Sequence, residues 1–290
     1  MQTTVLYSKP LQQEVKNQII ADVSNLKKQG KSPKLAIVQV GNDPASNVYV
    51  NIKKKTANEC GLEFKHILFD EKTTQKELDS GINKLNNDNS VSGIILQLPV
   101  PKHLNCRQSI DIISPKKDVD GLTSINAGKL ELGLDDAIVP ATPLGIMNLL
   151  KWQNINLAGL NAVVIGRSHL VGRPMASLLS KANATVTVCH KETKNIKYYL
   201  KNADLIVCAA GCPALVKNEH IKKGAILIDV GTTPEICELT GKKSLNGDVC
   251  KQVQLENSNA SMVTPVPGGV GPMTVISLIS NVVNACKGKH

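Results

Sequence analysis

The sequence predicts an α/β protein built from two α/β domains, each with a parallel sheet covered by helices on both faces. Short continuous apolar segments alternate with helical patterns up to residue 101, and the alternation starts again at residue 161. Buried parallel strands are apolar throughout, and the helices that connect them cover the two faces of the sheet. The length of 290 residues fits two domains of ordinary size.

The first predicted element is a surface helix over residues 10–30, which Gly30 ends. One apolar stripe recurs along it at helical spacing: Leu11, Val15, Ile19, Val23 and Leu26. The alternation that follows predicts strands at residues 34–41, 63–69 and 92–101 and helices at residues 45–61 and 73–88.

A loop at residues 114–122 ends the first half, and we expect the domain boundary between residues 120 and 145. The next helix is predicted over residues 139–152, with Thr142 as N-cap and Pro143 as the first helical residue. Further elements are strands at 161–166, 184–189, 204–211 and 224–231, helices at 171–182 and 193–203, and a final apolar helix after a Pro/Gly-rich loop at 264–272.

The composition, 42% apolar and 20% charged, is that of an ordinary globular protein. No apolar segment approaches the roughly 20 residues of a membrane span. The opening residues "MQTTVLYSKP" lack the basic and apolar parts of a signal peptide, so we expect a cytoplasmic protein.

The formal net charge of +10 raises the question of nucleic-acid binding, but the lysines are dispersed and aromatic residues make up only 2%. Base-stacking surfaces need more aromatics, so anionic small molecules are the expected partners, with no nucleic acid and no membrane. The eight cysteines form no C-x-x-C pair and have no histidine at ligand spacing, so we expect reduced thiols and no metal.

The turn "VIGRSHLVGRP" joins a strand to a helix in the manner of a dinucleotide-binding turn. Gly166 ends the strand and Gly172 begins the helix, where backbone N–H groups hold a pyrophosphate. The pattern departs from the standard fingerprint, because Ser168 occupies the position of the close-approach glycine and the loop is one residue longer. A turn with only a structural role is the alternative.

The end of the next strand distinguishes the two nicotinamide cofactors. An NAD site usually places an acidic residue there, whereas this chain has His190 and Lys191, with Glu192 just beyond. Together with Arg167 they form a cationic pocket suited to a 2′-phosphate, which favours NADP. The alternative is that Lys191 lies in solvent.

In "YVNIKKK", Tyr49 and Lys53 share one face of the predicted helix, while Lys54 and Lys55 turn away from it. Lys53 is therefore a candidate catalytic group, although a solvated basic face is the ordinary interpretation of such a pattern. Gln97 is a candidate partner, because it lies near the carboxyl end of its strand, where open α/β sheets bind ligands. It also fits an ordinary strand-end residue.

Two loops are further candidates for ligand binding. Asp118 and Asp120 lie in a glycine-terminated turn, and such pairs often only form the turn. The loop "PVPGGVGP" has prolines that stiffen it and glycines that allow close approach to a flat ligand, although a purely structural turn fits as well.

Five motifs, in order, resemble the bifunctional methylenetetrahydrofolate dehydrogenase/cyclohydrolase family: "YVNIKKK", "LQLPVP", "KDVDGL", "VIGRSHLVGRP" and "TPVPGGVGPMT". The resemblance covers about residues 35 to 280. It implies a homodimer that acts in one-carbon metabolism and purine biosynthesis, and a last helix that returns to the first domain. It also implies a folate-binding catalytic domain at 1–121 plus 273–290 and a Rossmann-like NADP-binding domain at 122–272.

The resemblance also implies the two activities and the residues that serve them. Methylenetetrahydrofolate is oxidised with NADP to methenyltetrahydrofolate, which is then hydrolysed to formyltetrahydrofolate. Lys53 is the expected proton-transfer group, Tyr49 and Gln97 orient its amine, and Asp120 binds the pterin edge. Expected substrate contacts are Tyr49, Lys53, Leu96, Gln97, Leu98, Asp120, Pro267, Gly268, Gly269, Val270 and Gly271, and expected cofactor contacts are Gly166, Arg167, Ser168, Lys191, Thr232 and Thr274.

One departure from the family concerns the cofactor. Many members have Gly-Ile-Asn where this chain has Gly231, Thr232 and Thr233, so contacts near the nicotinamide are expected to differ. The alternatives are an NADP-dependent dehydrogenase without the second activity or with another small substrate, which leaves Tyr49, Lys53, Gln97 and Asp120 without a shared role, and a basic RNA-binding protein.

Overall fold

The computed structural model describes residues 3–236, 243–254 and 258–288. The chain divides into two compact units. Unit 1 comprises Met1–Gln12 and Thr142–Thr274, and unit 2 comprises Gln13–Ala141 and Val275–His290. The division after Ala141, rather than after residue 121, leaves residues 122–141 in unit 2. The first 12 residues lie in unit 1, although the sequence analysis placed them in the other domain.

Unit 2 contains a three-stranded parallel sheet in the order β3-β2-β4. Its strands are β2 (Lys34–Val40), β3 (Glu63–Phe69) and β4 (Gly93–Leu96). All but the first residue of the central strand β2 are buried, which explains the continuous apolar segment that predicted it. The edge strand β3 is largely exposed.

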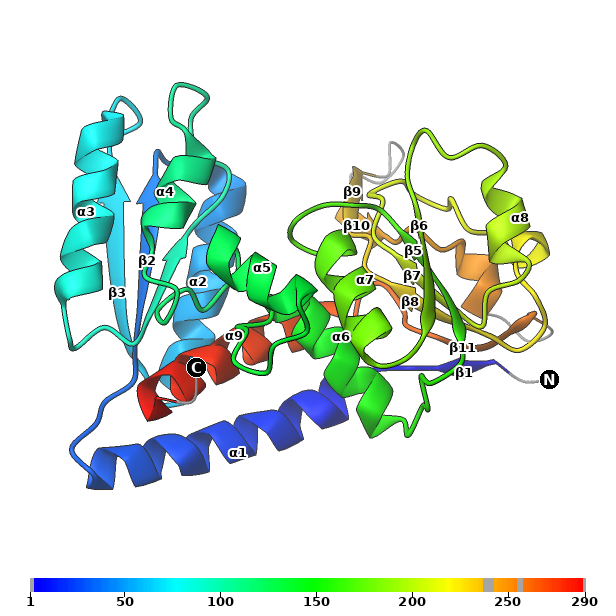
Figure 1. Ribbon diagram of the computed structural model, residues 1–290, viewed down its shortest axis with the longest axis horizontal. Helices are drawn as coiled ribbons and strands as arrows, with labels where there is room; N and C mark the ends of the chain where they lie inside the picture. Colours follow the sequence, from blue (N-terminus) through cyan, green and yellow to red (C-terminus); the bar gives the residue numbers. More distant parts are fainter. Residues whose placement is uncertain (1–2, 237–242, 255–257, 289–290) are drawn as a thin grey trace. The chain divides into compact units, whose positions relative to one another are not determined.

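Helices α2 (Pro44–Glu59) and α3 (Gln75–Asn87) connect these strands. The crossovers between parallel strands are right-handed, and the chain reverses its direction across the sheet after β3, so the two helices cover opposite faces (Figure 1). A capping box begins α3, because Thr74 Oγ1 accepts the Glu77 N–H and the Glu77 carboxylate accepts the Thr74 N–H at 2.8 Å. The predicted strands and helices of this half are confirmed.

Two helices of unit 2 were not predicted, α4 (Cys106–Ile112) and α5 (Ser124–Glu131). Both are too short to show a clear helical period in the sequence. Helix α1 (Lys9–Lys28) begins in unit 1 and continues in unit 2, and α9 (Gly271–Lys287) does the same. Within unit 2, the Asn281 side chain on α9 donates to the carbonyls of Val119 and Val139, each at 2.9 Å. The predicted return of the last helix to the first half is confirmed.

Unit 1 contains a six-stranded parallel sheet in the order β1-β11-β8-β7-β5-β6. Its strands are β1 (Thr4–Val5), β5 (Asn161–Ile165), β6 (Thr185–Cys189), β7 (Leu205–Cys208), β8 (Ala225–Asp229) and β11 (Ala260–Val263). The chain passes from β5 to β6 on one side and then to β7 on the other, so the strand order reverses at β5. In sheets of this kind, ligands bind outside the carboxyl ends of the strands at such a switch point.

Helices cover both faces of the unit 1 sheet: α6 (Ala141–Trp152), α7 (Gly172–Lys181) and α8 (Ile196–Leu200). Ile146 of α6 and Met175 of α7 pack on Val164 in one core cluster, and Leu200 of α8 packs on Ile165 in another. The prediction that Thr142 caps α6 was wrong, because the helix begins at Ala141 and the Thr142 hydroxyl lies 3.0 Å from the Thr274 hydroxyl.

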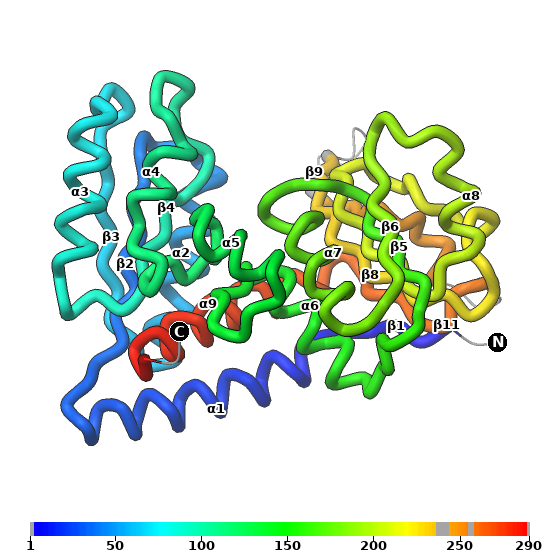
Figure 2. Tube along the Cα trace, viewed as in Figure 1, coloured from blue at the N-terminus to red at the C-terminus, as the bar shows by residue number. Residues whose placement is uncertain are grey.

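Other elements of unit 1 also differ from the sequence analysis. The helix predicted over 193–203 begins only at Ile196, because Asn195 has a left-handed backbone with φ 50°. Strands β1 and β11, which lie side by side although they come from opposite ends of the chain, were not predicted (Figure 2). Nor were the antiparallel strands β9 (Thr233–Ile236) and β10 (Lys243–Asn246) or the two 3-10 helices, Asn218–His220 and Lys251–Gln254.

Among the described residues, no helix is long and apolar enough to cross a bilayer. The same residues contain no cluster of three or more histidine, cysteine, aspartate or glutamate side chains that could hold a metal ion. The seven cysteines in the described part of the chain are free thiols.

Candidate active site and cofactor site

Lys53 of α2 and Gln97 at the end of β4 are in contact within unit 2. The Lys53 amine donates a hydrogen bond of 3.0 Å to Gln97 Oε1, and the Gln97 amide donates one of 2.8 Å to the Leu98 carbonyl. The second bond fixes which end of the amide faces the lysine. Helix α2 is itself anchored, because the Asp43 carboxylate accepts the Ser46 N–H at 2.8 Å and Pro44 begins the first turn.

The surroundings of Lys53 favour its neutral form. Burial lowers the pKa of the Lys53 ammonium, and the Asp120 carboxylate partly offsets this by raising it. Burial in turn raises the pKa of Asp120, which the positive charge of Lys53 lowers and the negative charge of Asp118 raises. The two groups are therefore electrostatically coupled, and each keeps the other closer to its charged form.

Tyr49 does not share this contact. Its side chain is 53% exposed, and its hydroxyl bonds to no residue in the described part of the chain. The neighbouring apolar side chains Val48 and Ile52 are exposed as well, at 57% and 43%. Of the two residues expected to orient Lys53, only Gln97 touches it in the structure. Lys54 and Lys55 are exposed, as the helical periodicity predicts.

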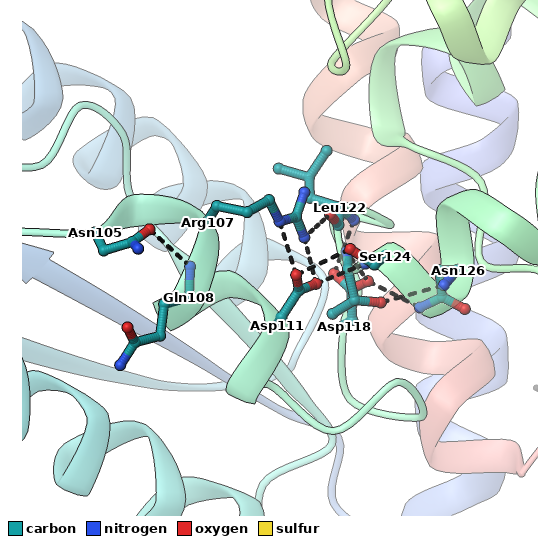
Figure 3. Close-up of polar contacts among 9 residues, drawn as sticks. Asn105, Arg107, Gln108, Asp111, Asp118, Leu122, Ser124 and Asn126 are labelled. Carbon is teal, nitrogen blue, oxygen red and sulfur yellow. Dashed lines mark hydrogen bonds and ion pairs between the residues drawn. The ribbon is translucent and has the colours of Figure 1, made fainter.

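The two aspartates of "KDVDGL" have different environments. Asp118 is 1% exposed and accepts the backbone N–H groups of Leu122 at 3.1 Å and Thr123 at 2.8 Å and the Asn126 side chain at 2.8 Å (Figure 3). Asp118 therefore forms the turn. The half-buried Asp120 carboxylate bonds to none of the described residues, which leaves its oxygens available to a ligand.

A second layer of contacts holds the same turn (Figure 3). The Arg107 guanidinium donates to the Asp111 carboxylate, at 2.9 Å from Nε, and to the Leu122 carbonyl at 2.7 Å. Asp111 also accepts the Ser124 N–H at 2.6 Å. These residues lie on the unpredicted helices α4 and α5 or next to them, so the sequence analysis did not find them.

The turn between β5 and α7 in unit 1 is compact at both glycines. Gly166 has φ +115°, and a Cβ there would lie 2.2 Å from the Ala209 carbonyl oxygen. A Cβ on Gly172 would lie 2.1 Å from the Gly166 carbonyl oxygen. Ser168 Oγ accepts the N–H groups of Val171 at 3.2 Å and Gly172 at 3.5 Å, so this side chain caps the start of the helix.

Replacing Gly166 by alanine is expected to weaken NADP binding and to destabilise unit 1. The methyl group would collide with the β7 loop, and the backbone conformation disfavours any side chain; strain of this kind costs about 1–3 kcal/mol. Gly159→Ala is the matched control, because Gly159 has φ +79° but nothing within 4 Å of its Cβ position. Thermal unfolding with and without NADP measures both effects, and equal losses in the two variants would contradict the expectation.

The predicted 2′-phosphate residues lie at adjacent strand ends. β5 and β6 pair from Asn161 to Ile165, so Arg167 and Lys191 both follow the same edge of the sheet, and both are exposed. The Lys191 amine lies 3.7 Å from the Glu192 carboxylate, and His190 Nδ1 accepts the Glu192 N–H at 3.3 Å. The absence of an acidic side chain at the end of β6 and the two exposed cations fit NADP.

The Pro/Gly-rich loop lies in unit 1. Ser8 near the amino terminus holds it, because its N–H donates to the Gly268 carbonyl at 3.1 Å and its hydroxyl to the Gly269 carbonyl. Val270 of this loop and Leu96 of unit 2 are buried in their cores, so their side chains pack inside the protein, whereas Leu98 is half-buried.

Thr232 and Thr274, the remaining predicted cofactor contacts, also lie in unit 1. Thr232 is exposed after β8. Thr274 is half-buried and pairs with Thr142. Their contacts with the cofactor stay a prediction.

Comparison with known proteins identifies the family. Residues 6–120 match the family model "Tetrahydrofolate dehydrogenase/cyclohydrolase, catalytic domain", and residues 140–290 match the model of the "NAD(P)-binding domain" of the same family. This chain belongs to the tetrahydrofolate dehydrogenase/cyclohydrolase family. The resemblance noted from the five motifs is thus confirmed.

Individual members of the tetrahydrofolate dehydrogenase/cyclohydrolase family are similar over the full length. The bifunctional protein FolD of Staphylococcus epidermidis is 47% identical over 287 residues, which cover 99% of this chain and 98% of that protein. The crystal structure of the bifunctional enzyme FolD from Campylobacter jejuni has a TM-score of 0.93 at 43% identity, covering 99% and 100% of the two chains. The Trypanosoma brucei enzyme, solved with NADP and an inhibitor, has a TM-score of 0.92 at 35% identity, covering 100% and 99%.

Proposed function

We propose that this enzyme oxidises methylenetetrahydrofolate with NADP and then hydrolyses the methenyltetrahydrofolate that forms to formyltetrahydrofolate. The observation that carries the proposal is the contact between Lys53 and Gln97, where an amine whose pKa burial lowers lies in the field of an unpartnered carboxylate. Both family models and the full-length bifunctional relatives support the pair of activities, and they disfavour an enzyme with only the dehydrogenase activity.

In the first step, NADP accepts a hydride from the one-carbon bridge of the folate. A nitrogen lone pair of the folate compensates the loss of the hydride, so the methenyl cation forms without a general base. The contribution of the chain is to position the two molecules. Gly166 and Gly172 allow close approach of the backbone to the pyrophosphate, and Arg167 and Lys191 supply positive charge for the 2′-phosphate.

In the second step, water adds to the methenyl carbon and a carbon–nitrogen bond opens. The water loses a proton as it adds, and the departing ring nitrogen gains one, so a group that exchanges protons near neutral pH is needed. Lys53 fills this role, since burial brings its amine closer to the neutral form and Gln97 Oε1 orients it. Asp120 accepts N–H bonds from the amino-pyrimidine edge of the pterin, and the exposed Tyr49 offers a ring face beside Lys53.

The test mixes the purified protein with methylenetetrahydrofolate and either NADP or NAD, and records nicotinamide reduction together with methenyl absorbance. Reduction of NADP with little methenyl accumulating supports both activities. Accumulating methenyl contradicts the hydrolytic role of Lys53, and no reduction with either cofactor contradicts the dehydrogenase activity.

We also infer that two copies of the chain associate. Strand β3 is the edge of its sheet, and the described part of the chain provides no strand along its outer side; Leu68 on this strand is 56% exposed. Light scattering is expected to give twice the chain mass of 31.1 kDa. Leu68→Lys is expected to lower that mass, whereas Leu132→Lys, at a residue of the same unit that is 76% exposed, is expected to leave it unchanged. A wild-type protein with the mass of one chain would rule out the association.

A further inference from the structure

Two buried carboxylates lie at the carboxyl end of the unit 1 sheet, and neither was a candidate in the sequence analysis. Asp229 ends β8 and is 1% exposed; Asp248 is fully buried. Asp229 accepts the N–H groups of Gly231 at 3.0 Å, Asp248 at 2.9 Å and Val249 at 2.9 Å. Asp229 therefore fixes the backbone that carries Asp248.

Asp248 in turn organises the loop that follows β7. Its Oδ2 accepts the N–H groups of Ala210 at 2.6 Å and Gly211 at 3.1 Å, and its Oδ1 accepts that of Cys212 at 2.8 Å. The chain leaves no room for a larger residue beside either carboxylate. A Cβ on Gly231 would lie 2.4 Å from Asp248 Oδ1, and one on Gly247 would lie 1.9 Å from Asp229 Oδ2.

The organised loop lies at the switch point of the sheet. β5 and β7 are neighbours in the strand order on either side of the reversal, and the Gly166 Cβ position lies 2.2 Å from the Ala209 carbonyl oxygen. The loops after β5 and β7 therefore form the two sides of the crevice in which such sheets bind a dinucleotide. Gly166 belongs to one side, and Ala210 to Cys212 form the other.

We infer that Asp248, held in place by Asp229, is a positioning residue for the cofactor, because it fixes the backbone of residues 210–212 as one wall of the dinucleotide crevice. The inference rests on the proposed use of NADP. Burial raises the pKa of Asp229 to about 6 even though three N–H groups stabilise its charged form, and the charge of Asp248 raises it further. Two such carboxylates are unfavourable to bury together, and a turn with only a structural role would not need them.

The first test uses the wild-type protein. Cys212 is exposed, so iodoacetamide is expected to alkylate it, and saturating NADP is expected to slow that reaction at least fivefold because the loop becomes covered. Cys106, a partly exposed thiol of unit 2, is the control measured by mass spectrometry in the same sample. NADP binding in a calorimeter without protection of Cys212 overturns the inference but leaves the proposed function intact; no NADP binding overturns both.

The second test replaces Asp248 by asparagine. The amide would direct an NH₂ group at one of the backbone donors, and the unpaired buried N–H is expected to raise the Kd and the KM for NADP about tenfold, with a smaller change in kcat. Asp204→Asn is the matched control, because Asp204 also accepts a backbone N–H in this sheet but lies just before β7, at the opposite end. A Kd for NADP within twofold of the wild-type value in a folded Asp248→Asn protein would overturn the inference.

Discussion

Replacing Lys53 by alanine is expected to slow the hydrolysis of methenyltetrahydrofolate by about 10²- to 10⁴-fold, the contribution that a positioned proton-transfer group makes. Alanine is the best helix former, and Gln97 keeps its own bond to the Leu98 carbonyl, so the fold is expected to persist. Reduction of NADP is expected to continue. Methenyltetrahydrofolate should therefore accumulate, which stopped-flow absorbance measures directly.

Lys54→Ala is the matched control for this variant. Lys54 is the next residue of α2 and is exposed, so its removal changes the net charge equally without touching Gln97. Hydrolysis by Lys54→Ala is expected at the wild-type rate. Wild-type hydrolysis by Lys53→Ala would exclude a catalytic role for Lys53, and unfolding of that variant would show that the role of Lys53 is structural.

Replacing Asp120 by asparagine is expected to raise the KM for the folate by roughly 10- to 100-fold, the range for losing a hydrogen bond to a charged group. The carboxylate offers two acceptor oxygens and bonds to none of the described residues, whereas an amide would direct an NH₂ donor at the N–H groups of the pterin. Steady-state kinetics with varied folate at saturating NADP give the value. An unchanged KM would exclude contact between Asp120 and the substrate.

The same variant is expected to change the pH dependence of hydrolysis. The Asp120 charge raises the pKa of Lys53, so neutralising residue 120 lowers the pKa of the Lys53 amine further below its ordinary value. Hydrolysis that needs the neutral amine increases as pH rises through this pKa, and its rising limb therefore moves to lower pH. Profiles of kcat measure the shift, with Asp136→Asn, at an exposed carboxylate that pairs with Lys129, as control. A limb that moves upward would refute the coupling.

The sequence predicts those strands whose apolar segments are long enough to recognise. β2 and β5 are continuous buried segments, so their composition alone marks them. β1 has only two residues and is a strand because it pairs with β11, more than 250 positions away. A segment whose structure depends on a partner so distant in the sequence has no local signal.

The same distinction applies to the sites. Lys53 and Gln97 were predicted because helical periodicity and the strand-end rule are local properties of the sequence, and the structure brings the two side chains together. Asp248 was missed because its function depends on the backbone of residues 210–212, which the strand pairing places beside it. The distinction between Asp118 and Asp120 was likewise invisible, since it depends on the unpredicted helix that contains Asn126.

The division of the chain into units has a consequence for protein synthesis. The chain changes unit after Gln12, after Ala141 and after Thr274, so neither unit is a continuous segment. A nascent chain emerges amino terminus first, and β1 has no partner until β11 has left the ribosome. Unit 2 likewise lacks Asn281 and its bonds to Val119 and Val139 until the end of translation. Both units are therefore completed only after release of the chain, and a stop codon before α9 would leave each of them unfinished.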